Sequence, residues 1–115
     1  LLEYSVLANK NDLLTKELML RNYIFLNRDE EAFEIAKELI FLYPNNETYG
    51  NFYFLYISKL KKYDELYMNP IIYFSNNLKI HLSFYSTLRE EEKFNKNSFN
   101  KLVRYSESVF PNKKF

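Results

Sequence analysis

The chain has no cysteine, one glycine, three prolines and one histidine among its 115 residues. The absence of cysteine excludes disulfides, thiol catalysis and Cys-rich zinc sites. Tight β-turns draw heavily on glycine and proline, so their scarcity argues against an all-β fold. No uninterrupted apolar stretch reaches 18 residues, and the sequence therefore predicts no transmembrane helix.

Hydrophobic residues make up 47% of the chain, which is enough to form the core of one domain and argues against disorder. Tyr and Phe number 11 each and Asn numbers 14. An AT-rich gene would produce this bias, and an aromatic binding groove is the alternative. The chain begins at Leu1 without Met or a basic leader, so we expect a soluble fragment of a longer protein, of unknown compartment.

Charge is balanced overall but differs between the two halves of the chain. Residues 1–57 hold five Lys or Arg against nine Asp or Glu, and residues 58–115 hold eleven against six. Chance clustering explains this difference, and the alternative is head-to-tail stacking of oppositely charged ends. The net charge of +1 argues against a nucleic-acid partner and against direct membrane insertion.

A short pattern of an apolar helix end, a breaker and an amide recurs three times, and we call each copy a mark. The marks are residues 41–46, 72–77 and 108–113. Their spacings of 31 and 36 residues average close to 34, the length of a two-helix repeat. We therefore expect one all-α domain over residues 1–115, with a cap at 1–11 and helical hairpins at 12–46, 47–77 and 78–112.

Apolar residues at helical spacing predict about seven helices. A short helix at 2–8 is followed by one capped at Asn11 or Asp12 and ending near Leu26. The others cover about 29–43, 47–62, 65–74, 78–93 and 98–110, with Ser98 as the cap of the last. The runs at 52–57 and 78–84 also fit buried strands, but no partner strand is evident and we favour helix.

One proline falls inside a predicted helix. Pro70 lies within 65–74, where the ring removes a backbone hydrogen bond and clashes with the preceding turn. We therefore expect a kink or break near Met68 and Asn69.

These features resemble the tetratricopeptide-repeat (TPR) family, most clearly in the first hairpin. Tyr23, Ala32 and Pro44 match the aromatic, small and terminal proline positions of its motif, and Met19 replaces a Leu. The sequence departs from the motif at Lys16, Leu20 and Ala36, and the second and third hairpins match less well. The resemblance implies a right-handed α-solenoid, and other α-solenoids or an irregular helical bundle are the alternatives.

No residues suggest catalysis, a cofactor or a metal site, and we expect the chain not to be an enzyme. His81 has no evident nucleophile or orienting partner, so we interpret it as a surface or partly packed residue. Glu90, Glu91 and Glu92 point about 100° apart on a helix and cannot converge on one ion. Lys59, Lys61 and Lys62 lie near tyrosines that could stack bases, but a solvated face is the simpler interpretation.

The resemblance implies a protein–protein interaction scaffold, whose first helices line a concave groove for a peptide or partner segment. The alternative is a structural spacer that self-associates within a larger assembly. By helical spacing, two stripes are candidates for partner contact, and packing in the core is the alternative for Phe25 and Leu55. The candidates are Glu17, Arg21 and Phe25 on the second helix and Asn51, Leu55, Ser58 and Lys59 on the fourth.

Overall fold

The computed structural model describes residues 9–91 and 95–115. Over these residues the fold is all-α, with six α-helices, one 3-10 helix (η1) and no strand. The helix predicted at 2–8 lies outside the described residues. The elements in chain order are α2 (Asn9–Phe25), α3 (Asp29–Leu42), α4 (Glu47–Leu60), α5 (Asp64–Met68), η1 (Ile71–Tyr73), α6 (Leu78–Leu88) and α7 (Lys96–Val109).

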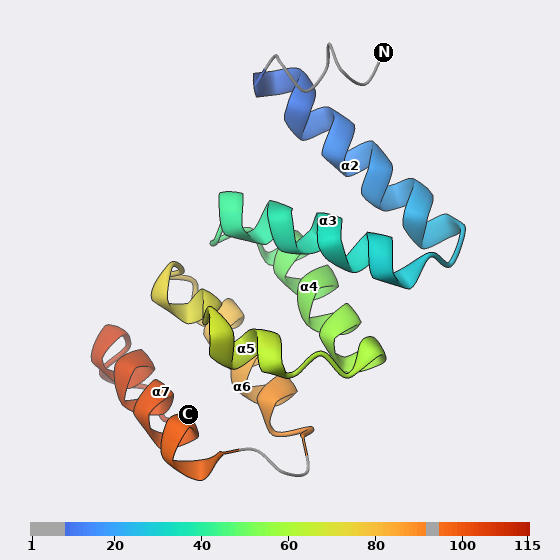
Figure 1. Ribbon diagram of the computed structural model, residues 1–115. Helices are drawn as coiled ribbons and strands as arrows, with labels where there is room; N and C mark the ends of the chain where they lie inside the picture. The colour runs from blue at the N-terminus through green and yellow to red at the C-terminus, as the bar shows by residue number, and fades with distance from the viewer. Residues whose placement is uncertain (1–8, 92–94) are drawn as a thin grey trace.

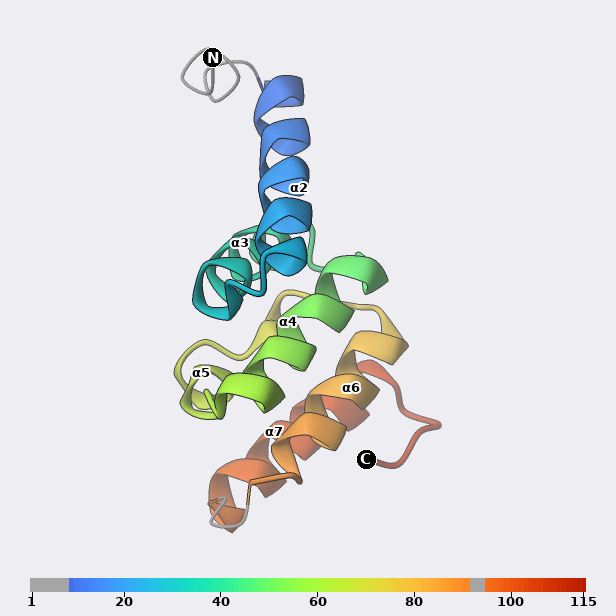
Figure 2. The same ribbon diagram turned by 90° about the vertical axis from the view of Figure 1, so that its right-hand side faces the viewer.

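The helices pack mainly on their neighbours in the chain, which gives an elongated body measuring 47 × 27 × 19 Å. Figure 1 shows α2 at one end and α7 at the other, with the N-terminal part of α2 extending away from the rest. α4 and α6 pack side by side, and Figure 2 shows α3 and α5 to the left of this pair and α7 partly behind α6.

α3 forms the centre of the core because both α2 and α4 pack against it. Ala32 and Ala36 are fully buried, and such small side chains let neighbouring helices approach closely. The Phe33 ring stacks on Tyr53 of α4 with the ring centroids 5.9 Å apart. Helical spacing predicts a one-sided stripe of Ala32, Ile35, Ala36, Leu39, Ile40 and Tyr43 on this helix. The prediction is confirmed except at Tyr43, which is 44% exposed, and Phe33 is buried as well.

Asparagine residues cap the N-termini of three of the helices. Asn46, Asn77 and Asn95 each accept a hydrogen bond from a backbone N–H in the first turn of α4, α6 and α7, at 2.9–3.0 Å. These bonds satisfy donors that have no partner within the helix. The cap predicted at Ser98 is therefore wrong, since Ser98 donates to Asn95 from inside α7.

Two other predicted boundaries are also wrong. α2 already begins at Asn9, so Asn11 and Asp12 lie inside the helix and are not its cap. α6 ends at Leu88, whereas the sequence pattern predicted a helix to Lys93. Apolar spacing continues to Leu88 and three glutamates follow, so no buried stripe supports a longer helix.

The first two marks are hydrogen-bonded to each other. The Asn45 side-chain oxygen accepts from the Ser75 hydroxyl at 2.9 Å and from the Asn76 backbone at 2.8 Å. The Asn77 amide donates to the Asn45 carbonyl at 3.0 Å. The first two marks therefore share a structural role, since their amides cap α4 and α6 and tie the two turns together.

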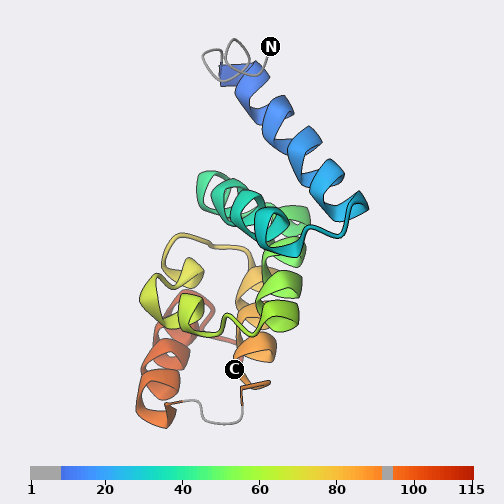
Figure 3. The ribbon, with the colours of Figure 1, turned by 45° about the vertical axis from the view of Figure 1, so that its right-hand side comes forward.

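The predicted break at Pro70 is confirmed. α5 ends at Met68, Asn69 leaves the helical region with φ −148° and ψ 78°, and η1 begins at Ile71. Proline disfavours the helical conformation of the residue before it, which explains why the helix ends there. The interruption leaves Met68 and Phe74 exposed while Ile71 and Ile72 stay in the core. Figure 3 shows the short α5 and the loop through which the chain passes from it towards α6.

His81 is fully buried, which corrects the expectation of a surface or partly packed residue. Its Nε2 lies 2.8 Å from the Ser75 carbonyl, an acceptor only, so Nε2 carries the proton. Nδ1 then accepts from the Ser106 hydroxyl at 2.7 Å, and Ser106 accepts from the Tyr85 hydroxyl at 2.7 Å. These hydrogen bonds join α7 to α6, and they are satisfied by the neutral form of the His81 imidazole.

We predict that stability falls as the pH drops below 6.5. Burial lowers the pKa of His81 below its ordinary value of 6.5, so the unfolded chain binds the proton more readily than the folded chain. The free energy of unfolding should then fall by up to about 1.4 kcal/mol per pH unit as the pH drops below that value. Urea denaturation between about pH 5 and pH 7 measures it, with the less pH-sensitive His81→Asn variant as control. A flat wild-type profile would contradict the assignment.

We predict that Gly50→Ala destabilises the packing of α4 on α6. A Cβ at Gly50 would lie 2.4 Å from Ile80 Cδ1, and Ile80 is buried. Overpacking costs about 1–3 kcal/mol and alanine returns about 1 kcal/mol of helix propensity, so a net loss of about 1 kcal/mol is expected. Ile80→Val removes the clashing methyl and should offset the loss in the double variant. Additive single effects in thermal or urea unfolding would rule out this contact.

Candidate functional site

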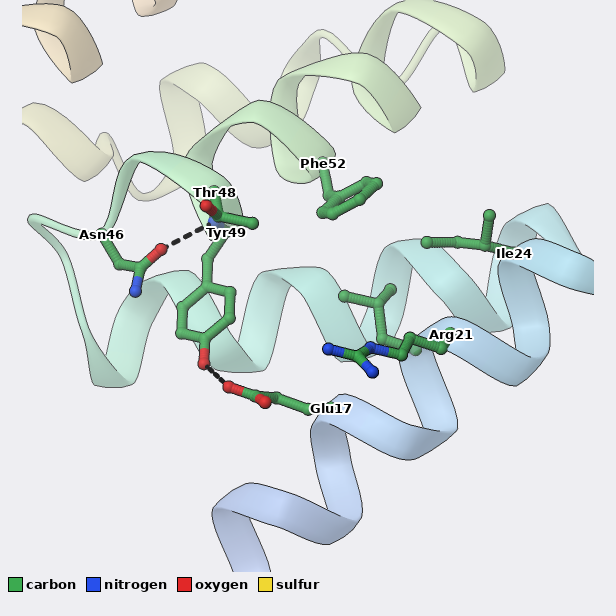
Figure 4. A pocket seen from close by; sticks show the side chains of 8 residues that line it. Glu17, Arg21, Ile24, Asn46, Thr48, Tyr49 and Phe52 are labelled. Atoms are coloured by element: carbon green, nitrogen blue, oxygen red, sulfur yellow. Dashed lines mark hydrogen bonds between the residues drawn. The ribbon is translucent and has the colours of Figure 1, made fainter.

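A hollow of 380 Å³ lies between α2 and the first turns of α4. Figure 4 shows side chains from both helices around it, with Ile24 and Phe52 as apolar walls and Glu17 and Arg21 below them on α2. Thr48 and Asn46 add a hydroxyl and an amide at the N-terminal end of α4. The hollow thus combines an apolar floor with a few polar groups, as ligand and peptide sites do. Its lining residues are Glu17, Leu20, Arg21, Ile24, Asn46, Thr48, Tyr49 and Phe52.

A hydrogen bond between α2 and α4 closes one side of this hollow. The Tyr49 hydroxyl donates to the Glu17 carboxylate, which joins the two helices across the gap (Figure 4). Burial, followed by this bond and by the carboxylate charge, raises the pKa of Tyr49 to about 12. Tyr49 therefore remains a neutral donor at physiological pH, and Glu17 is committed to an internal contact.

Arg21 has no ion-pair partner within residues 9–91 and 95–115. It is exposed and lies one helical turn beyond Glu17 at the edge of the hollow. An exposed guanidinium beside an apolar wall offers a charged hydrogen-bond donor to a partner carboxylate. Arg21 is thus the free charge of this site.

A second hollow of 370 Å³ lies between α4 and α6. Glu47 and Lys79 lie in it and form an ion pair at 3.6 Å. A hydrogen bond from Asn77, supported by the Lys79 charge, lowers the pKa of Glu47. The two charged groups of the second hollow are therefore paired with each other. The hollow is lined by Glu47, Asn51, Lys79, Ile80, Leu82 and Ser83.

The seven predicted contact residues fall into three groups. Glu17 and Arg21 line the first hollow and Asn51 lines the second. Leu55 and Phe25 line neither, but they are 54% and 84% exposed, so the alternative that they pack in the core is wrong. Leu55 lies one turn after Asn51 and extends the exposed strip of α4 between the hollows.

Ser58 and Lys59 make other contacts instead. The Ser58 hydroxyl donates to Glu90 at 2.6 Å, beyond the end of α6. The Lys59 ammonium pairs with Asp29 of α3 at 3.3 Å and lies over the Tyr56 ring. Both side chains fasten α4 to neighbouring elements, so the structure does not bring them to the hollows.

Two signals would have found residues that the sequence interpretation missed. Thr48, Phe52 and Leu55 share one helical face by their spacing of four and three residues, which would have extended the α4 stripe. A shift of 31 residues takes Asn51 to Leu82, and the same repeat spacing would have assigned α6 a share of the site.

Three ion pairs join cations of the second half of the chain to acids of the first half, and the Lys37–Glu65 pair joins the halves in the opposite sense. Lys59, Lys62 and Lys79 of the second half pair with Asp29, Glu30 and Glu47 of the first, at 3.2–3.6 Å. Exposed pairs such as these contribute less than about 1 kcal/mol each, but they place opposite charges side by side. These pairs bring some charges of the two halves together within the body, while residues 96–115 keep five Lys or Arg against one Glu.

In the part of the chain that the structure describes, no group of His, Asp or Glu residues could hold a metal ion. No helix there has both the length and the apolar character needed to cross a membrane. Comparisons with protein-family models, with curated proteins and with solved structures found no match for this chain. Functional interpretation therefore depends on the geometry of the site itself.

We predict that Tyr49→Phe lowers the free energy of unfolding by about 1 kcal/mol, because it leaves a partly buried carboxylate without its donor. Tyr43→Phe is the matched control, since its ring is 44% exposed, and should change stability by less than about 0.5 kcal/mol. Urea denaturation compares the two variants. Equal effects would mean that the bond between α2 and α4 contributes nothing in solution.

Proposed function

We propose that this chain is a non-catalytic, TPR-like scaffold that binds a peptide or partner segment along α2, α4 and α6. The observation that carries the proposal is the pair of hollows on either side of α4, of 380 and 370 Å³. Both lie between helices separated by one intervening α-helix in the chain order, as are the helices that line the concave groove in a solenoid of helical hairpins.

The side chains along this path suit a partner segment rather than a small molecule. Ile24 and Phe52 supply apolar contact in the first hollow, and Leu82, which is 46% exposed, supplies it in the second. Leu55, also exposed, lies one turn beyond Asn51 and Phe52 on α4. An exposed apolar strip with flanking amides and hydroxyls favours a peptide, because main-chain groups find donors while side chains find apolar surface.

Arg21 would orient a segment bound along α2, α4 and α6. It is the free cation of the first hollow, whereas the second hollow carries the internally paired Glu47 and Lys79. A bound segment with an acidic group would therefore place that group beside α2. Such charge complementarity sets register and orientation more than raw affinity.

The alternative, a spacer that self-associates through oppositely charged ends, receives less support. Lys59, Lys62 and Lys79 of the second half are already paired with acids of the first half within the chain. It also gives no role to the hollows beside α4. We therefore favour recognition of a partner over self-association.

We predict that Arg21→Glu weakens binding of peptides selected from a phage-displayed random library by about tenfold, as expected for reversal of one interface charge. Fluorescence anisotropy of labelled selected peptides measures the affinity, and circular dichroism should find helical content and melting temperature nearly unchanged. Leu55→Asp tests the apolar strip in the same assay.

Arg104→Glu is the matched control, since it makes the same charge change on exposed α7, away from both hollows. It should alter affinity by no more than about twofold. Selected peptides that bind the Arg21 and Leu55 variants as tightly as the wild type would refute the groove.

A further inference from the structure

The face formed by α3, by α5 with η1, and by α7 carries two further hollows. One, of 520 Å³, lies beside α3 and reaches Asn69, and the other, of 360 Å³, lies between the α5–η1 segment and α7. α5 has 5 residues where α3 and α7 have 14 each, so the short helix leaves space on both of its sides. Figure 3 shows α3 above α5 and α7 on this face, with α4 and α6 to the right of α5 and α7.

An exposed apolar ridge of Met68, Tyr73 and Phe74 separates these two hollows. Met68 is 76% exposed, and Tyr73 and Phe74 are 46% and 55% exposed. Met68 lines the hollow beside α7, whereas the next residue, Asn69, lines the hollow beside α3. Apolar side chains that are grouped and this exposed mark sites of protein–protein contact. A ridge with a hollow next to it fits a second copy of itself, because two-fold rotation places each ridge in the hollow of the other copy.

The two hollows also carry opposite charges that form no ion pair among the described residues. Beside α3, Lys37 and Glu38 pair with side chains of neighbouring helices at 2.8 and 3.2 Å, whereas Glu34 forms no such pair. Beside α7, Lys101 is the charged residue of the lining and forms no such pair either. Both side chains are exposed. The ridge therefore has an unpaired acid on one side and an unpaired cation on the other.

We propose that this face is a homodimer interface, on which a second copy docks by two-fold rotation with Glu34 of each copy beside Lys101 of the other. The rotation exchanges the α3 side and the α7 side of the face, so an unpaired acid meets an unpaired cation twice in each dimer. The Met68 side chain of each copy enters a hollow of the other and is removed from water. The apolar ridge thus lies at the centre and the charges lie at the rim, as in other protein interfaces.

This dimer differs from the end-to-end stacking considered above for a spacer. A two-fold contact closes on itself, whereas head-to-tail contacts continue into a chain of copies. The interface shares no lining residue with the hollows beside α4, so the proposal does not rest on the proposed function and can fail without it. Both partner sites would stay open in the dimer, and a partner with two copies of its segment would gain avidity.

Sedimentation equilibrium of the full chain tests the dimer. With rising concentration at low salt, the mass should increase from 14.1 kDa towards twice that value. Glu34→Lys and Lys101→Glu should each weaken dimerisation by at least about tenfold, because the two-fold axis repeats each new repulsion. An equimolar mixture of these two variants should dimerise again, since each reversed charge then faces its opposite across the interface.

Lys113→Glu is the matched control, because it makes the same charge change on an exposed residue beyond α7. It should change the dimer dissociation constant by no more than about twofold. A wild type that stays monomeric at every concentration would overturn the proposal, as would single variants that dimerise like the wild type. A mixture of Glu34→Lys and Lys101→Glu that remains monomeric, or an equal loss of dimer in Lys113→Glu, would contradict the pairing of Glu34 with Lys101.

Discussion

The packing of α3 between α2 and α4 is the constraint on which the rest of the structure depends. The fully buried Ala32 and Ala36 allow the neighbouring helices to approach α3 closely. The Phe33 ring stacks on Tyr53 and so positions α4 against α3. With α2 and α4 held on the same central helix, the Tyr49–Glu17 bond joins their exposed sides and leaves the first hollow between them. The candidate site is thus a consequence of core packing in α3 and of its small side chains.

The same arrangement repeats with variation towards the C-terminus. Gly50 lets α6 lie close to α4, and the bonds from Asn45 to Ser75 and Asn76 tie the corresponding turns together. Pro70 shortens α5, whereas α7 is again a continuous helix and is joined to α6 by the buried bond between His81 and Ser106. The first helix of each pair lies on the side of the hollows beside α4, and the second helix is interrupted only in the middle pair.

Much of this fold could be predicted from the sequence, and the failures have physical causes. The α3 stripe and the break at Pro70 followed from helical spacing and proline sterics. The caps at Asn77 and Asn95 were missed because a capping amide is defined by backbone geometry, which apolar spacing does not report. The burial of His81 depends on the Ser106 hydroxyl, 25 residues away, and on the Ser75 backbone carbonyl, which no local pattern reveals. For the site, Glu17, Arg21 and Asn51 were found by helix spacing, whereas Ser58 and Lys59 were lost to Glu90 and Asp29.

The central claim is that a partner segment lies along α2, α4 and α6, and an NMR titration tests it most directly. The ¹⁵N-labelled chain would be titrated with an unlabelled peptide selected for binding to it. The account predicts that amide shifts change most at Arg21, Phe52, Leu55 and Leu82, around the two hollows beside α4. Changes confined to α3, α5 and α7, with those four amides unmoved at saturation, would contradict it.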